Sequence, residues 1–434
     1  MISNFKHFSN VKPVLLLASI LINSSINANA EMFNRGELPD LIFKAGFEEQ
    51  LIWVMNANNQ VSINIVKSNG DPVLVDVESV GSSNINNVDY VSVTASGIPS
   101  YSIILNQNEI DALNNRPKAG TDFSGGQTSA TAGNAIEFGE DIGYNSNSNQ
   151  GACLSTGGYG YWPPGPDCPE DTEKTGNFPI NPQPNNETCD TGLGVIGYFV
   201  NGVSIFNWGD GQSYNNQRVW FNLAAKAETY DLDVCDGHAA RGDYHHHFYS
   251  QCLANAIGDT ANGHSPIYGF AADGYAIHGP WHAEGVLTKS AWVTRDYDNA
   301  ADPYGCGGTG NRTCIMVDEF DPSMGTQNTG QIGPSTSATI ISLSGNQFDA
   351  ITGFYYQDYY YDVNLTNSGE QYLDENSGHE HGSYGYHYHL PTVMNQDGKL
   401  VPEFPTTIGP RFYGELPDDA VTSCGGMMPP PPRR

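Results

Sequence analysis

Residues 194–208 have the sequence GVIGYFVNGVSIFNW, in which two runs rich in Val, Ile and aromatic residues flank the pair Asn201-Gly202. Such runs favour strands, and an Asn-Gly pair between them is a strong signal for a two-residue hairpin. The stretch therefore predicts a β-hairpin with a type I′ turn. Further strands are expected at 217–223, 244–249, 275–281, 338–343, 353–363 and 385–390.

The chain before this hairpin has a similar character. Residues 51–118 contain short β-prone runs such as VSINIVK and VDYVSVTA, separated by Asn, Gly and Pro turns, with NEIDALNN as the one helical patch. We expect a small β module over 31–118 and a linker at 115–135. A larger domain is expected over 119–423, with its core at about 190–415, followed by a flexible Pro-rich tail over 424–434.

Composition points to the same fold class. Only 15% of the 434 residues are charged, whereas 49 residues are Gly and 11% are aromatic. The predicted fold is mainly β: a disulfide-stapled, β-rich, sandwich-like domain with long loops, preceded by the small β module. The formal charge of −30 would repel nucleic acid and anionic membranes, so we expect neither as a partner.

Residues 1–30 have the layout of a secretory signal peptide. Lys6 and Lys12 are basic, the stretch from Val14 to Ile22 is apolar, and Ala28-Asn29-Ala30 is an A-x-A cleavage site. The apolar run is too short to span a bilayer, and no later segment is long enough, so no membrane span is expected. The protein is predicted to be cleaved after Ala30 and to be secreted or periplasmic.

The number of cysteines is even, which in an exported chain favours disulfides over thiolate metal sites. Proximity suggests two of the pairs, Cys235 with Cys252 and Cys306 with Cys314, and the remaining connectivity is open. The eight cysteines are Cys153, Cys168, Cys189, Cys235, Cys252, Cys306, Cys314 and Cys424.

Apart from His7, every histidine lies between 238 and 389, and most fall in two similar clusters. Residues 233–247 (DVCDGHAARGDYHHH) and 374–389 (DENSGHEHGSYGYHYH) both reduce to D-x-x-x-G-H, a short turn, and Y-H-x-H. Alternate residues of a strand share a face, so His245 should point with His247 and His387 with His389. The turn would bring His238 or His379 back beside its pair.

Three imidazoles per cluster make the ligand set of an open zinc or copper site. We therefore predict six metal ligands, in two sites or in one dinuclear site: His238, His245, His247, His379, His387 and His389. Asp233 and Asp374 are candidates for outer acceptors that fix the imidazole tautomers, and His246 and His381 are taken as incidental. Two alternatives stay open, namely a half-buried Tyr/His face, and a cleft in which the histidines shuttle protons.

The segment between the clusters, GHSPIYGFAADGYAIHGPW (263–281), carries two candidate catalytic residues. His264 is a candidate ligand or base, and Asp273 is a candidate for orienting it. The alternative for Asp273 is turn chemistry, because Asp-Gly is a common hairpin turn. Calcium is a further possible cofactor at acidic groups such as Asp231/Asp233 and Asp296/Asp298/Asp302, although neither has the spacing of an EF-hand loop.

Together, these motifs resemble the bacterial YHYH-domain family. The resemblance rests on residues 194–220, the first cluster, GHSPIYGFAADGYAIHGPW, the YGYHYH of the second cluster, and IGPRFYG (408–414). It implies an exported bacterial protein and supplies no activity. The first cluster has Tyr-His-His-His in place of Tyr-His-Tyr-His, yet we favour it as the functional copy because it is followed by the G-H-S-P-I segment.

The sequence predicts an exported metalloprotein. If it is an enzyme, a metal with an open coordination position would acidify water or polarise a carbonyl group, which implies hydrolysis, whereas copper would imply oxidation. The alternative is a noncatalytic binding module that sequesters metal, or holds a carbohydrate or peptide on its Tyr and Trp residues. The ligand, a small molecule or an extracellular polymer, is not indicated by the sequence.

Overall fold

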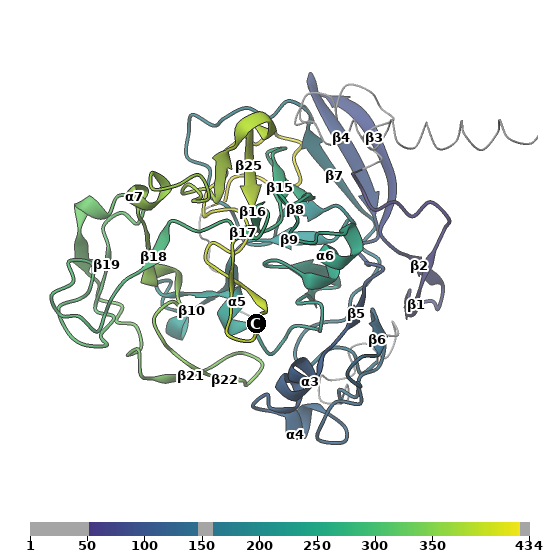
Figure 1. The fold of residues 1–434 in the computed structure, drawn as a ribbon, viewed down its shortest axis with the longest axis horizontal. Helices are drawn as coiled ribbons and strands as arrows, with labels where there is room; N and C mark the ends of the chain where they lie inside the picture. Colours follow the sequence, from purple (N-terminus) through teal and green to yellow (C-terminus); the bar gives the residue numbers. More distant parts are fainter. Residues whose placement is uncertain (1–51, 146–158, 426–434) are drawn as a thin grey trace, which may run out of the picture.

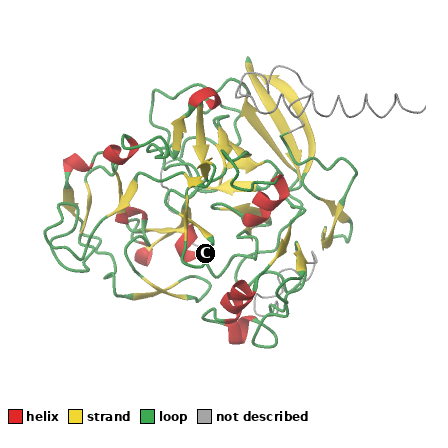
Figure 2. Cartoon of the chain, in the orientation of Figure 1, coloured by secondary structure: helices red, strands yellow, loops and turns green. Residues whose placement is uncertain are grey.

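The computed structural model describes residues 52–145 and 159–425, so the predicted signal peptide and the last residues of the predicted tail lie outside the described residues. The protein is mainly β, as expected, and Figure 2 shows strands throughout the molecule, joined by long loops and a few short helices. The dominant element is an eight-stranded mixed sheet of order β12-β13-β9-β8-β14-β15-β25-β24. Its strands are β8 (Val195–Phe199), β9 (Ser204–Phe206), β12 (His238–Ala240), β13 (Asp243–His246), β14 (Ile267–Ala271), β15 (Ala276–His278), β24 (Gly378–Glu380) and β25 (Tyr386–His389).

The predicted hairpin at 194–208 is confirmed as β8 and β9, but its turn differs from the expectation. A type I′ turn needs positive φ at both central residues. Of the pair Asn201-Gly202, only Gly202 has a positive φ, 80°, and its N–H donates to the carbonyl of Phe199. The connection is therefore a longer loop that ends in a left-handed glycine, and the type I′ prediction was wrong.

The central sheet is built twice from the same unit. Hairpin β8–β9 has β13 parallel to β9 and β12 antiparallel to β13, while hairpin β14–β15 has β25 parallel to β15 and β24 antiparallel to β25. The two units meet where β8 pairs antiparallel with β14, around the pair Tyr198 and Phe270. Val200 donates to the carbonyl of Tyr268, and the equivalent Ala272 donates to that of Ile196. The sheet therefore has a pseudo-twofold axis between β8 and β14.

The N-terminal part of the chain is joined to this sheet through a common core. Its three-stranded sheet pairs β4 (Val88–Ala95) with both β3 (Val77–Ile85) and β7 (Lys174–Pro179), and it flanks one side of the central sheet (Figure 1). Trp53 stacks on Phe270 of β14 with ring centroids 5.5 Å apart. The remaining elements here are β1 (Val61–Val66), β2 (Pro72–Leu74), β5 (Ser102–Ile104), β6 (Ala135–Glu137), α3 (Gln107–Asn114) and α4 (Ala119–Asp122).

Helix α3 confirms the helical patch, whereas the segment predicted as a linker is packed. Within 115–135 the Arg116 guanidinium pairs with Asp122 at 3.1 Å, and both side chains are buried. Phe123, also buried, stacks on Tyr144 at 4.2 Å. The Gly, Ser and Thr residues around these anchors make the segment look flexible in the sequence, but the few large side chains hold it in place.

Opposite the three-stranded sheet, the chain forms small two-stranded sheets linked by long loops (Figure 1). The buried Arg312 guanidinium holds this region together, because it pairs with Asp358 at 2.7 and 2.9 Å and donates to three backbone carbonyls. The strands are β10 (Gly209–Ser213), β11 (Phe221–Leu223), β16 (Trp281–Ala283), β17 (Val286–Leu287), β18 (Trp292–Thr294), β19 (Cys314–Met316), β20 (Thr326–Asn328), β21 (Thr339–Ile341), β22 (Gln347–Asp349), β23 (Tyr359–Tyr361), β26 (Thr392–Met394) and β27 (Leu400–Pro402). The helices outside the N-terminal part are α5 (Ala224–Ala227), α6 (Gln251–Ile257) and α7 (Val363–Thr366).

Both disulfides suggested by proximity are confirmed, Cys235–Cys252 and Cys306–Cys314. A third bond joins Cys189 to Cys424, which stands at the first position of the predicted tail. Cys168 is also disulfide-bonded. Such bonds are typical of proteins outside the cytoplasm. Within 52–145 and 159–425, the structure has no helix that is both long and apolar enough to cross a bilayer.

The contact between β8 and β14 gives a test of the duplicated sheet. A Cβ on Gly197 would lie 2.3 Å from the carbonyl oxygen of Phe270, and a Cβ on Gly269 would lie 2.5 Å from that of Tyr198. Gly197→Ala and Gly269→Ala should each lower the free energy of unfolding by about 1–3 kcal/mol, because backbone must move apart. Gly81→Ala in β3 is the control, since its Cβ would meet no atom within 4 Å. Thermal unfolding measures all three, and an unchanged Tm for both sheet variants would contradict the close packing.

Candidate metal centres

The first histidine cluster forms a group that we call site one: His238, His245 and His247. Strands β12 and β13 pair His238 with His245, and His247 follows directly after β13. One ring nitrogen from each residue lies within 4.8 Å of the others, and all three residues are buried. The predicted folding of His238 back beside its pair is confirmed, while metal binding by the group stays a prediction.

Backbone carbonyls fix the orientation of two of these rings. His245 Nδ1 lies 2.9 Å from the carbonyl of Asp243, and His247 Nδ1 lies 2.6 Å from that of Asn207. A neutral ring that donates from Nδ1 keeps its lone pair on Nε2, which is the usual arrangement of a metal-ligating histidine. The two Nε2 atoms are 3.2 Å apart. Two nitrogen ligands of a tetrahedral zinc ion lie about 3.3 Å apart, so the spacing fits one ion.

Site one also contains a carboxylate that the sequence analysis did not identify. Glu228, directly after α5, places Oε2 3.3 Å from His238 Nε2 and 3.2 Å from His247 Nε2. Burial acts to raise the pKa of Glu228, but the charges of His247 and His238 outweigh it and the pKa lies well below its usual range. Nothing in the local sequence marks this residue, because α5 and β12 meet only in the fold.

The second cluster forms site two: His264, His379, His387 and His389. One nitrogen from each of the four rings lies within 4.8 Å of the others. The Nε2 atom of His387 is 3.1 Å from that of His389 and 3.1 Å from that of His264. All four Nδ1 atoms lie 2.6–2.9 Å from backbone carbonyls, those of Ser265, Glu370, Gly385 and Gly279 respectively.

The imidazoles of site two are held neutral. Burial lowers the pKa of His264 and of His379 to about 4, and it places the pKa of His389 well below its usual value. His379 Nε2 is buried and has no hydrogen-bond partner among the described residues. Neutral rings whose free lone pairs converge repel one another unless a cation or proton lies between them, so the geometry is that of a ligand set.

The two aspartates predicted as outer acceptors for the histidines have another role. Asp233 accepts from Tyr244 Oη at 2.7 Å and from the N–H groups of Cys235 and Gly237. Asp374 repeats this arrangement with Tyr386 Oη at 2.9 Å and the N–H groups of Asn376 and Gly378. Each aspartate therefore holds the Gly-His turn against the Tyr of its own cluster, while backbone carbonyls fix the tautomers.

Asp273 also lies away from the imidazoles that it was expected to orient. It is fully buried and accepts from Tyr388 Oη at 2.6 Å and from the N–H groups of Tyr275 and Gly414. The contact with the N–H of Tyr275 is the turn chemistry considered as its alternative role, while Tyr388 and Gly414 come from distant parts of the chain. His246, taken as incidental, lies on the opposite face from site one, where its ring nitrogens contact Tyr101 Oη and the carbonyl of Asp236.

The two sites are separate. Strands β13 and β25 are five strand positions apart in the sheet, which corresponds to about 24 Å, so one dinuclear site is excluded. His264 belongs to site two, because β15 lies beside β25 and brings the G-H-S-P-I segment with it. The reason given for favouring the first cluster as the functional copy, its proximity to this segment, was therefore wrong.

Site two is surrounded by further histidines that carried no assignment in the sequence analysis. His278 lies with its ring centroid 4.6 Å from that of His387 and 4.7 Å from that of His264. His282 and His381 form another group with His379, again with one nitrogen each within 4.8 Å. His381, taken as incidental, is thus part of a cluster. In the sequence, the concentration of histidines between residues 264 and 389 could have indicated this larger group.

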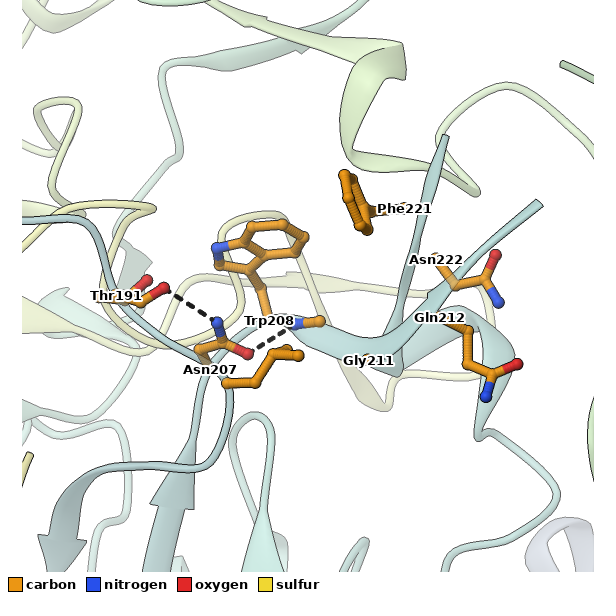
Figure 3. A pocket seen from close by; sticks show the side chains of 9 residues that line it. Thr191, Asn207, Trp208, Gly211, Gln212, Phe221 and Asn222 are labelled. Atoms are coloured by element: carbon orange, nitrogen blue, oxygen red, sulfur yellow. Dashed lines mark hydrogen bonds between the residues drawn. The ribbon is translucent and has the colours of Figure 1, made fainter. Parts of the chain in front are cut away.

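A small pocket, drawn in Figure 3, is lined in part by Asn207. The backbone carbonyl of the same residue contacts His247 Nδ1. The walls of the pocket include Leu193, Trp208 and Phe221, and none of its lining residues belongs to either site. The acidic groups considered for calcium are engaged within the protein: Asp231 accepts from Ser344 and Asn346, and Asp296 accepts from the backbone of its own turn.

Comparison with known proteins identifies only the central segment. No curated protein and no solved structure matches the chain. Residues 175–306 match the family model described as YHYH protein, a range that begins in β7 and contains site one and His264. The resemblance inferred from the motifs is therefore confirmed over residues 175–306, which match the YHYH family model.

Proposed function

We propose that this exported protein binds two transition-metal ions, one in site one and one in site two. The observation that carries the proposal is the convergence of Nε2 lone pairs whose orientation is fixed by Nδ1 contacts to backbone carbonyls. The same contacts from Nδ1 to backbone carbonyls occur in both sites, one in each unit of the duplicated sheet. Imidazole ligands suit zinc and copper, and the acidic chain gives either cation a favourable long-range field.

A second candidate function, metal-assisted hydrolysis, is favoured at site one by Glu228. Three imidazoles leave a tetrahedral metal one position for water, and a bound metal would lower the pKa of that water. The Glu228 carboxylate lies beside two of the three rings, where it can accept a proton from such a water. Site two offers four imidazoles instead, which fill a tetrahedral coordination shell and favour retention of the metal.

The alternative of a carbohydrate or peptide module that uses exposed aromatic rings has less support. Carbohydrate binding needs aromatic faces at the surface. Of the aromatic residues that the structure describes, only Tyr159 is exposed. Sequestration of metal without catalysis remains the main alternative to hydrolysis, and it predicts the same ligands.

Metal analysis of the mature chain tests the first proposal. Residues 31–434, exported with their disulfides and purified without a His tag, should contain about two equivalents of zinc or copper. His245→Ala/His247→Ala should lose one equivalent, and His387→Ala/His389→Ala should lose the other, because each removes two ligands of one site. Each variant is the folding control for the other, since retention of the distant ion requires the duplicated sheet. Absence of metal after incubation with zinc and copper would reject the proposal.

Hydrolysis of an activated aryl ester by the zinc-loaded protein tests the second candidate function, metal-assisted hydrolysis. Glu228→Gln should keep the metal content of site one and lower kcat/KM about 10²-fold or more, because the proton acceptor is lost. The control is His387→Ala/His389→Ala, which should retain the activity. Zinc-loaded protein without esterase activity, or an unchanged rate in Glu228→Gln, would leave metal sequestration as the function.

A further inference from the structure

Beside site two, nearer the surface, lies a third imidazole group: His282, His379 and His381. His282 is in β16, and His381 follows β24, which contains His379. The rings of His282 and His381 stack with centroids 4.5 Å apart, and they lie 5.5 and 5.4 Å from the ring of His379. One nitrogen from each ring lies within 4.8 Å of the other two.

Each ring of this group has a buried nitrogen without a hydrogen-bond partner in the described part of the chain: Nδ1 of His282, Nδ1 of His381 and Nε2 of His379. Buried polar atoms are normally hydrogen-bonded, so three unpaired nitrogens in one cluster point to a bound ion or water. Three imidazoles make a set that a zinc or copper ion can occupy.

His379 belongs both to this group and to site two. Its Nδ1 contacts the carbonyl of Glu370, which leaves Nε2 as the one nitrogen whose lone pair can bind a metal ion. A single lone pair binds one ion at a time. An ion held by His282, His381 and His379 therefore excludes an ion that uses His379 in site two, and the two positions are alternatives rather than neighbours.

Exposure decreases from His282 and His381 towards two rings of site two. His282 and His381 are half-buried, as is His264 of site two, whereas His379 is 9% exposed, His387 is 1% and His389 is 0% exposed. A cation that enters beside His282 and His381 thus meets these two rings before it reaches His387 and His389.

We infer that His282, His381 and His379 form an entry site through which the metal ion of site two is captured and released, an inference that rests on the proposed metal binding. The ion keeps its bond to His379 Nε2 while it exchanges His282 and His381 for His264, His387 and His389. Only coordination bonds change, and the oxidation state of the metal and the protonation of the rings stay the same. The entry site is a transient position, and site two is the resting position.

The test uses the mature chain carrying His245→Ala/His247→Ala, so that only site two binds. Zinc uptake by the metal-free protein and zinc release to a chromogenic chelator are followed by stopped flow. Adding His282→Ala/His381→Ala should slow uptake and release by the same factor, about tenfold or more, and leave the equilibrium affinity and the one-ion stoichiometry unchanged. Glu380→Ala is the matched control, because this exposed residue lies between His379 and His381 and should leave both rates unchanged.

The equal change of both rates distinguishes a pathway from a structural effect, because damage to site two would accelerate release and weaken affinity. Unchanged rates in His282→Ala/His381→Ala would overturn the entry site. A parent that binds two zinc ions, one of which is lost in that variant, would also overturn it by showing a permanent third site. A parent that folds but binds no zinc at any concentration tested would reject metal binding at site two itself.

Discussion

The antiparallel contact between β8 and β14 is the constraint on which both histidine sites depend. Gly197 and Gly269 allow the two backbones to approach where a side chain would strike a carbonyl oxygen. The pairing lies on the pseudo-twofold axis, so each strand leads through its own hairpin to a parallel neighbour, β13 or β25. These neighbours carry the two H-x-H motifs. The axis therefore determines that the molecule has two equivalent sites at opposite ends of one sheet, rather than one site between two domains.

Within each unit, the energetic problem is to bury several imidazoles with their lone pairs together. The Asp-Tyr pairs, Asp233 with Tyr244 and Asp374 with Tyr386, hold the Gly-His turns, and backbone carbonyls take the Nδ1 protons. Burial then lowers the pKa values of His245 and His389 and keeps these two rings neutral. Burial acts in the same direction on His238, but the Glu228 charge outweighs it and raises the pKa of His238. The Nε2 atoms then converge on one another, which is unfavourable unless a proton or a cation lies between them. The hydrogen bonds around the rings therefore stabilise this arrangement of imidazoles in the absence of a metal ion.

Local sequence rules predicted what depends on local geometry. The alternation in H-x-H placed His245 with His247 and His387 with His389, and the G-H turn returned His238 and His379 to their partners. Local rules could not identify Glu228 or assign His264 to site two. These residues are brought to their sites by the order of the strands in the sheet, which local sequence does not define. The duplication was visible in the sequence, since GYFVNGVSI (197–205) and GFAADGYAI (269–277) align without a gap. The repeat alone does not place the two sites, because their separation depends on the order of the strands in the sheet.

The duplicated units differ at one position that separates the chemistry of the two sites. His264 precedes β14 by as many residues as Gly192 precedes β8, so the position that supplies the fourth imidazole of site two has no side chain in the other unit. At Gly192 the backbone of Gly425 packs instead, anchored by the Cys189–Cys424 bond. Site one instead has a carboxylate, Glu228, beside two of its three imidazoles. Four nitrogen ligands favour retention of a metal ion, whereas three nitrogen ligands beside a carboxylate favour activation of a water bound to the metal. One fold can therefore combine metal retention with hydrolysis.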